Sequence, residues 1–211
     1  MNREQLRLYL VTDRDAAKGR DMVGVVRQAV KGGVTMVQLR EKAACTRDFV
    51  ELGQRLTEVL RPLGVPLLVN DRIDVALAIG ADGVHIGQSD MPYKMARQIL
   101  GSGKIIGLSV ESLDDVRSAN ALDVDYVGVS PVFSTPTKTD TKRPFGLDGL
   151  RKAVELSVHP VVGIGGMNVQ TAAPVMCCGA DGIAVVSAII GAENPERASR
   201  ELLQQISDAI V

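Results

Sequence analysis

The sequence predicts an α/β fold, a single (β/α)8 TIM barrel that spans residues 1–211. Eight short apolar runs alternate with amphipathic stretches of helical length, and such alternation is typical of a parallel sheet. Eight copies of one strand–helix unit indicate a sheet that closes on itself. The same Gly-Ala-Asp-Gly turn joins a helix end to a strand start at 80–83 and again at 179–182, which supports the repeat.

The predicted strands are nearly continuous in Val, Ile and Leu, as expected of parallel strands that are covered on both faces. They span residues 8–13, 36–41, 66–71, 83–87, 104–110, 125–132, 160–166 and 182–188. The predicted helices span residues 21–31, 46–61, 73–79, 92–100, 112–121, 147–157, 169–178 and 195–209. Thr46, Ser112 and Asn194 are expected to cap helices, and Pro195 takes a first helical position.

Turns and loops complete the predicted barrel. The Asp of each Gly-Ala-Asp-Gly turn faces the bottom of the barrel, so both carboxylates are expected to be structural. Residues 134–144 are polar and interrupted by Pro, and we interpret them as a lid, with a plain surface loop as the alternative. A doubly wound open sheet is the alternative fold, but no G-x-G-x-x-G turn follows the first predicted strand.

Composition excludes several classes of function. The net charge is −1, aromatic residues make up 3% and Trp is absent, so neither a basic field nor a base-stacking platform for nucleic acid is expected. No apolar run approaches the roughly 20 residues of a membrane-spanning helix, and no signal peptide is evident, so the cytoplasm is expected. The three cysteines cannot all pair, and Cys177 and Cys178 are expected to be buried thiols. The oligomeric state does not follow from the sequence.

Two carboxylates end neighbouring predicted strands, at the end of the barrel where enzymes of this fold have their active sites. Asp71 is the last residue of the predicted strand 66–71, and Asp90 comes shortly after the predicted strand 83–87. Magnesium usually takes one or two carboxylates and completes its shell with water and substrate phosphate, so the pair predicts a site for one Mg²⁺ ion. Each Asp could instead cap the helix that follows it.

Cations and polar groups gather at the same strand ends. Arg40 and Lys42 share one side of a strand end, and Lys138 is expected to approach from the lid, a set that suits a diphosphate. A solvated charged loop is the alternative. Gln38 lies on the same side as Arg40 and could bond a neutral polar ring, whereas the side chain of Glu41 should point the other way.

The last two strands end in features of a monophosphate site. Gly165-Gly166 and Val186-Ser187 follow them, where barrels often bind phosphate through backbone N–H groups. Tight turns without a ligand are the alternative. His85 is interpreted as a packed or bridging residue, and no nucleophile and base pair is evident. Departure of a diphosphate, assisted by a metal ion and cations, therefore fits best.

The chain resembles the thiamine phosphate synthase family over nearly its whole length. The resemblance rests on the strings LYLVTDR, VQLREK, LLVNDR, DGVHIGQSDMP, GLSVES, VGVSPVFSTPTK, GIGGM and VVSAI. It implies a transferase that couples a hydroxymethylpyrimidine diphosphate with a thiazole monophosphate and releases diphosphate.

The resemblance also implies roles by position. Arg40, Lys42, Ser109 and Lys138 are the expected catalytic residues, and Asp71 and Asp90 the magnesium ligands. Pyrimidine diphosphate contacts are expected from Gln38, Arg40, Lys42, Asn70, Ser109 and Lys138, with Leu39 and Glu41 in the same segment. Thiazole phosphate contacts are expected from Thr135, Pro136, Thr137, Gly166, Val186 and Ser187. The alternatives are a thiazole tautomerase of the same barrel family, a phosphosugar isomerase and a non-catalytic sensor of a phosphorylated ligand.

Overall fold

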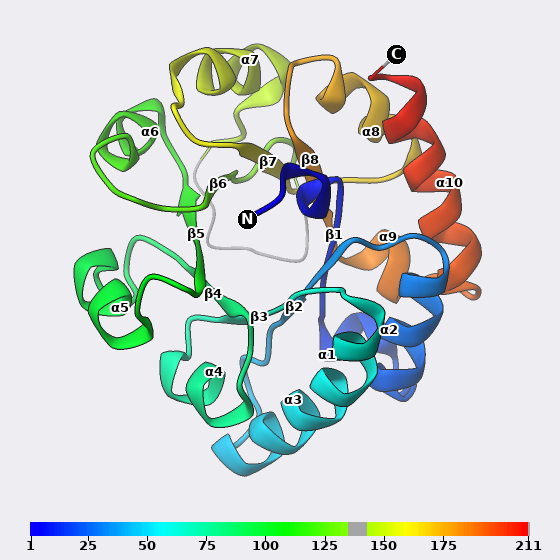
Figure 1. The fold of residues 1–211 in the computed structure, drawn as a ribbon. Coiled ribbons are helices and arrows are strands. Elements are labelled where there is room, and N and C mark those ends of the chain that lie inside the picture. The colour runs from blue at the N-terminus through cyan, green and yellow to red at the C-terminus, as the bar shows by residue number, and fades with distance from the viewer. Residues whose placement is uncertain (135–142, 211) are drawn as a thin grey trace.

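The computed structural model describes residues 1–134 and 143–210, and its parallel strands close into a barrel in the order β1 to β8 (Figure 1). This confirms the predicted (β/α)8 fold. The strands are β1 (Leu8–Val11), β2 (Met36–Leu39), β3 (Leu67–Asn70), β4 (Gly83–Ile86), β5 (Ile105–Val110), β6 (Tyr126–Val129), β7 (Val161–Ile164) and β8 (Gly182–Val185). Most strands end earlier than predicted, because the polar residues after them leave the ladder and enter turns or helix starts.

Helices surround the barrel and lie outside the ring of strands (Figure 1). The predicted ones are α2 (Met22–Lys31), α3 (Thr46–Leu60), α4 (Ile73–Ile79), α5 (Tyr93–Leu100), α6 (Leu113–Ala119), α7 (Gly146–Leu156), α8 (Val169–Met176) and α10 (Pro195–Asp208). The short elements η1 (Arg3–Leu6), α1 (Arg14–Ala17), η2 (Arg61–Leu63) and α9 (Ser187–Ile190) were not predicted. Segments of three or four residues are too short to show a helical period.

Two apolar layers hold the fold together. One fills the space between strands and helices, and the other lies inside the barrel. The inner layer is built from side chains two residues apart on each strand, such as Tyr9 and Val11 of β1, because alternate strand residues face one side. Leu6 of η1 is fully buried in this layer, below the strands.

The N-terminal end of the barrel is tied by polar residues that precede even-numbered strands. Each accepts the backbone N–H at the start of the preceding strand. The pairs are Thr35 with Leu8 (3.0 Å), Asp82 with Leu67 (2.8 Å), Asp125 with Ile106 (2.9 Å) and Asp181 with Val161 (2.8 Å). The structural role predicted for the Asp of both Gly-Ala-Asp-Gly turns is confirmed.

Three local predictions can be compared with the structure. Ser112 and Asn194 cap α6 and α10 as predicted, since their side chains accept backbone N–H groups of the first turn. The predicted cap at Thr46 is wrong, because the helix begins at Thr46 and Cys45 holds the capping position without a side-chain bond. The prediction that Cys177 is buried is also wrong, because Cys177 is exposed, whereas Cys178 is buried as predicted. Helix α8 ends at Met176, so Cys177 belongs to the exposed cap.

No helix in the described part of the chain is long and apolar enough to cross a membrane.

Candidate active site

A cavity of about 690 Å³ lies at the C-terminal ends of the strands, the end predicted to carry the chemistry. It is lined by the described residues that sequence reasoning placed at a ligand, with two exceptions. Those that line it are Gln38, Arg40, Lys42, Asn70, Asp71, Asp90, Ser109, Gly166, Val186 and Ser187. Thr135, Pro136, Thr137 and Lys138, with most of the predicted lid, lie outside the described residues.

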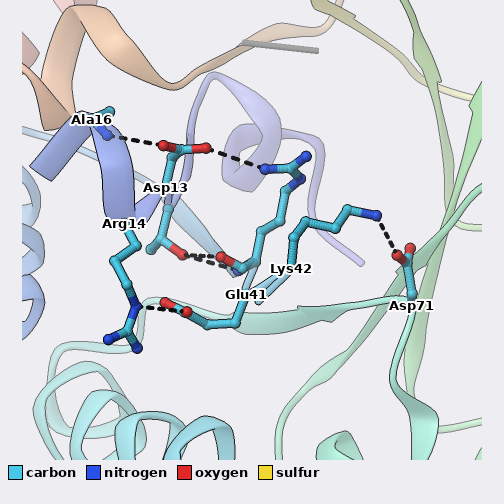
Figure 2. A network of polar contacts seen from close by, with 8 residues as sticks. Asp13, Arg14, Ala16, Glu41, Lys42 and Asp71 are labelled. Carbon is cyan, nitrogen blue, oxygen red and sulfur yellow. Dashed lines mark hydrogen bonds and ion pairs between the residues drawn. The ribbon is translucent and has the colours of Figure 1, made fainter. Parts of the chain in front are cut away.

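The two exceptions, Leu39 and Glu41, do not line the cavity. Leu39 is fully buried in the layer between strands and helices. Glu41 accepts a hydrogen bond from Arg14 Nε at 3.0 Å, and its side chain is only 2% exposed. Figure 2 shows Glu41 turned toward Arg14 while Lys42 reaches toward Asp71. Alternate residues of an extended segment face opposite sides, so these two side chains are not available to a ligand in the cavity.

Arg40 is held in place by the end of β1 and the start of α1. Its Nη1 donates to Asp13 Oδ2 at 3.2 Å, and its backbone N–H donates to Thr12 Oγ1 at 2.9 Å. Asp13 also accepts the N–H of Ala16 at 2.9 Å and so caps α1. The sequence alone indicates no role for Thr12 or Asp13, although both lie at a strand end. Asp13 orients the guanidinium and Thr12 holds the backbone of Arg40, which still lines the cavity.

Lys42 connects the cationic side of the cavity to the acidic side. Its Nζ lies 3.1 Å from Asp71 Oδ2, and its side chain is 60% exposed (Figure 2). An ion pair this exposed contributes about 0–1 kcal/mol. Lys42 is therefore able to exchange Asp71 for an incoming anion at little cost.

Asp71 and Asp90 form the acidic side. Burial raises the pKa of Asp90, and a hydrogen bond with Asp71 raises it further, so the two carboxyl groups are neighbours. Asp90 Oδ2 also accepts the N–H of Gly87 at 2.7 Å. Asp71 has a φ of 62°, a left-handed conformation that Asp tolerates better than most residues. Such a conformation is often retained where a side chain must point in one direction.

The acidic pair suits a divalent cation, although the described residues contain no cluster of three or more metal-ligating side chains. Burial and the neighbouring Asp71 raise the pKa of Asp90, and a cation bound between the two carboxylates would favour their ionised forms. Magnesium needs no more than two carboxylates when water and phosphate oxygens complete its shell. Asp71 and Asp90 therefore fit a magnesium ion that is shared with a phosphorylated ligand.

The opposite side of the cavity is formed by Gly165, Gly166 and the start of α9. The two glycines have φ angles of 99° and 68°, which side chains disfavour. A Cβ on Gly166 would lie 2.8 Å from Phe133 Cβ. The fold itself therefore requires glycine here, whether or not a ligand approaches the backbone. Ser187 begins α9 and faces the cavity, where the first N–H groups of a helix lack partners within the helix.

A row of hydrogen-bonded side chains forms the floor. Gln38 Nε2 donates to the Tyr9 hydroxyl at 2.7 Å, and the hydroxyls of Tyr9 and Tyr126 are 2.9 Å apart. His85 lies 2.8 Å from Tyr126 through Nδ1 and 2.8 Å from Ser109 Oγ through Nε2. Burial raises the pKa of both tyrosines, so they stay protonated at neutral pH. The interpretation of His85 as a bridging residue agrees with this geometry, while the tyrosines were missed.

Fold and site together place the chain among (β/α)8 barrels whose cavity at the strand ends sets cations against paired carboxylates. The model of the family described as thiamine monophosphate synthase matches residues 8–189. The chain belongs to this family.

Individual relatives agree with the family model. The thiamine-phosphate synthase of Albidiferax ferrireducens is 54% identical over 207 residues, which cover 98% of this chain and 94% of the relative. That of Vibrio parahaemolyticus is 51% identical over 197 residues, covering 93% and 96%. The solved structure of a thiamine phosphate pyrophosphorylase from Pyrococcus furiosus is 42% identical, with a TM-score of 0.91 and 99% of each chain covered. None of these relatives is named as a tautomerase.

A more distant likeness concerns the fold alone. A solved 3-hexulose-6-phosphate synthase is 18% identical, with a TM-score of 0.71 over 95% of this chain and 99% of that structure.

Proposed function

We propose that the chain couples 4-amino-2-methyl-5-hydroxymethylpyrimidine diphosphate with a thiazole monophosphate, giving thiamine phosphate and diphosphate. The observation that carries the proposal is the cavity itself, with Arg40 and Lys42 facing Asp71 and Asp90. A diphosphate and a magnesium ion would satisfy both sets of charges together. The names of the relatives support the same reaction.

Arg40 and Lys42 bind the diphosphate in this proposal. The guanidinium offers a planar pair of donors that is already oriented by Asp13, and the ammonium adds a mobile point charge. Asp71 and Asp90 hold one magnesium ion, which when bound would offset negative charge on the departing diphosphate. Lys138 is proposed as a third cation on the basis of the family resemblance.

Gln38, Asn70 and Ser109 orient the pyrimidine. In the proposed reaction the bond between the exocyclic methylene carbon and the diphosphate oxygen breaks, and both electrons leave with the oxygen. The pyrimidinylmethyl cation that remains is captured by the thiazole ring nitrogen through its lone pair. No proton transfer to carbon is needed, so the proposed reaction uses the cations and carboxylates that line the cavity.

The thiazole phosphate is bound on the opposite side of the cavity in this proposal. Backbone N–H groups near Gly166 and at Val186-Ser187 suit a monophosphate, and the Ser187 hydroxyl adds a donor. Thr135, Pro136 and Thr137 are further contacts implied by the family resemblance. Placing the two phosphates on opposite sides leaves the reacting carbon and nitrogen to meet between them.

The proposal is tested by incubating the purified protein with both substrates and following diphosphate release and thiamine phosphate formation. We expect equal amounts of both products, formed only with both substrates present and faster with magnesium. A thiazole tautomerase would release no diphosphate. A phosphosugar isomerase or a sensor would leave both substrates unchanged. Absence of diphosphate release, or two unchanged substrates, would contradict the proposal.

A further inference from the structure

The row of side chains in the cavity floor has a direction, because each group in it has a limited set of donors and acceptors. Gln38 has an amide with one oxygen and one NH₂, each tyrosine has one O–H, and a neutral imidazole has one donor and one acceptor nitrogen. In the described part of the chain, the Tyr9 hydroxyl is bonded to Gln38 and Tyr126. Tyr9 is 1% exposed, so a proton without an acceptor there would be unfavourable.

With His85 neutral, two arrangements of protons satisfy the bonds that the described members of the row make to one another. In the first, Gln38 donates to Tyr9, Tyr9 to Tyr126, Tyr126 to His85 Nδ1, and His85 Nε2–H to Ser109 Oγ. Gln38 then turns its amide oxygen to the cavity, and Ser109 turns its own O–H there. In the second, every bond is reversed, so Gln38 offers its NH₂ and Ser109 offers lone pairs.

The rings that carry the row are packed tightly enough to keep its geometry. A Cβ at Gly107 would lie 2.1 Å from Tyr126 Cζ, and one at Gly128 would lie 3.1 Å from His85 Cε1. These glycines leave the space that the rings fill. The rings of His85 and Tyr126 are stacked with centroids 5.5 Å apart, and Tyr9 meets Tyr126 edge-on at 5.9 Å. The row is therefore expected to reverse as a unit before it breaks.

We propose that Tyr9, Tyr126 and His85 are positioning residues that couple the Gln38 amide at one end of the row to the Ser109 hydroxyl at the other. A ligand that donates a hydrogen bond to Gln38 thereby makes Ser109 a donor. This inference rests on the proposed function, in which one ligand contacts both residues.

The ligand class that fits the first arrangement is a heteroaromatic ring with an exocyclic amine and a neighbouring anionic group. The amine donates to the Gln38 oxygen while the Ser109 O–H donates to an anionic oxygen. A ring with an oxo group in place of the amine needs the NH₂ of Gln38. It forces the second arrangement, in which Ser109 faces the anion with lone pairs. The row thus favours amino over oxo rings, because the ring group bonded to Gln38 decides whether Ser109 can donate to the anionic oxygen.

The test compares two unreactive probes, methylene-bridged analogues of the 4-amino and the 4-oxo pyrimidine diphosphate, by calorimetric titration with magnesium present. The wild-type protein is expected to prefer the amino probe by about tenfold or more, the size of one well-placed hydrogen bond. Tyr126→Phe keeps the stacked ring but leaves the Tyr9 O–H with the Gln38 oxygen as its acceptor. Its preference is expected to disappear or to favour the oxo probe.

Two further variants separate coupling from packing. The double variant Tyr9→Phe/Tyr126→Phe should prefer the amino probe no more than Tyr126→Phe does. Tyr126→Phe alone already interrupts the row, so removing the Tyr9 hydroxyl as well should not change the preference further. Tyr93→Phe is the matched control. Tyr93 begins α5, and its hydroxyl donates to the Asp123 carbonyl at 2.5 Å and not to a member of the row. It should keep the wild-type preference. If Tyr126→Phe does not fold by circular dichroism, Tyr9→Phe takes its place and should likewise lose the preference.

Equal weakening of both probes in Tyr126→Phe would overturn the coupling, while normal thiamine phosphate formation by the wild type would leave the proposed function standing. If the wild type binds neither probe, the coupling is overturned, and if it also forms no thiamine phosphate, the proposed function is overturned with it.

Discussion

Replacing Asp90 by Asn should lower activity without lowering the thermal stability of the metal-free protein. The pKa of Asp90 is raised by burial and by Asp71, so the ionised side chain is less stable in the folded than in the unfolded chain. Asp90 therefore contributes stability only in acid, and the contribution is lost as the pH rises through its folded pKa. Asn carries no charge, and its oxygen can still accept the Gly87 N–H. In EDTA at pH 7, Asp90→Asn should unfold at the same temperature as wild type or higher.

In magnesium, by contrast, the wild type should unfold at a higher temperature than Asp90→Asn. An ion present at a hundred times its Kd stabilises a folded protein by about 2.7 kcal/mol. For a chain of this size that is about 5–11 °C in Tm, at about 2–4 °C per kcal/mol. If loss of one of two carboxylates weakens the site about a hundredfold, the same ion concentration gives only about 0.4 kcal/mol. Wild type should then melt above Asp90→Asn, and turnover of the variant should fall by well over tenfold.

The assay is thermal unfolding followed by circular dichroism, in EDTA and in magnesium, with turnover measured on the same samples. Asp82→Asn is the matched control, because Asp82 lies at the opposite end of the barrel and accepts the Leu67 N–H at 2.8 Å. It should keep the full magnesium gain. A lower Tm for Asp90→Asn in EDTA, together with an undiminished magnesium gain, would mean that Asp90 is structural and the metal assignment is wrong.

Three further predictions concern single positions. Ser187→Ala should raise KM for the thiazole phosphate severalfold and leave that for the pyrimidine diphosphate unchanged; equal effects on both would argue against a separate monophosphate site. Gly166→Ala should lower the free energy of unfolding by about 1–3 kcal/mol even without ligand, because of its φ of 68° and its contact with Phe133, and an unchanged denaturant midpoint would contradict this. Arg40→Lys loses the planar fork held by Asp13 and should raise KM for the pyrimidine diphosphate about tenfold, whereas unaltered kinetics would show that charge alone suffices.

The fold could be predicted because it is encoded locally. Each apolar run and each amphipathic stretch carries its own period, and repetition of the unit implies closure. Asp82 and Asp181 could be assigned to the bottom of the barrel because they precede strands. The same logic places Arg40, Asp71 and Asp90 together, since the C-terminal ends of parallel strands meet at one rim.

What could not be predicted depends on side chains that meet across the barrel. Tyr9 and Tyr126 are separated by 117 positions, and nothing local shows that their hydroxyls touch. Asp13 caps α1 through its bond to Ala16, but its second bond joins it to Arg40, 27 positions away, and no local pattern shows that contact. Gly166 suggested backbone approach by an anion, yet its φ of 68° and its contact with Phe133 already disfavour a side chain there.

The central claim is that one cavity holds a diphosphate at its charged side and a phosphorylated thiazole at the other. A crystal structure of the protein with magnesium, diphosphate and thiamine phosphate tests it most directly. We predict the diphosphate between Arg40 and Lys42, a magnesium ion on Asp71 and Asp90, and the thiamine phosphate group at the start of α9. Products bound outside the cavity, or a diphosphate at α9 with the Asp71–Asp90 side empty, would contradict the claim.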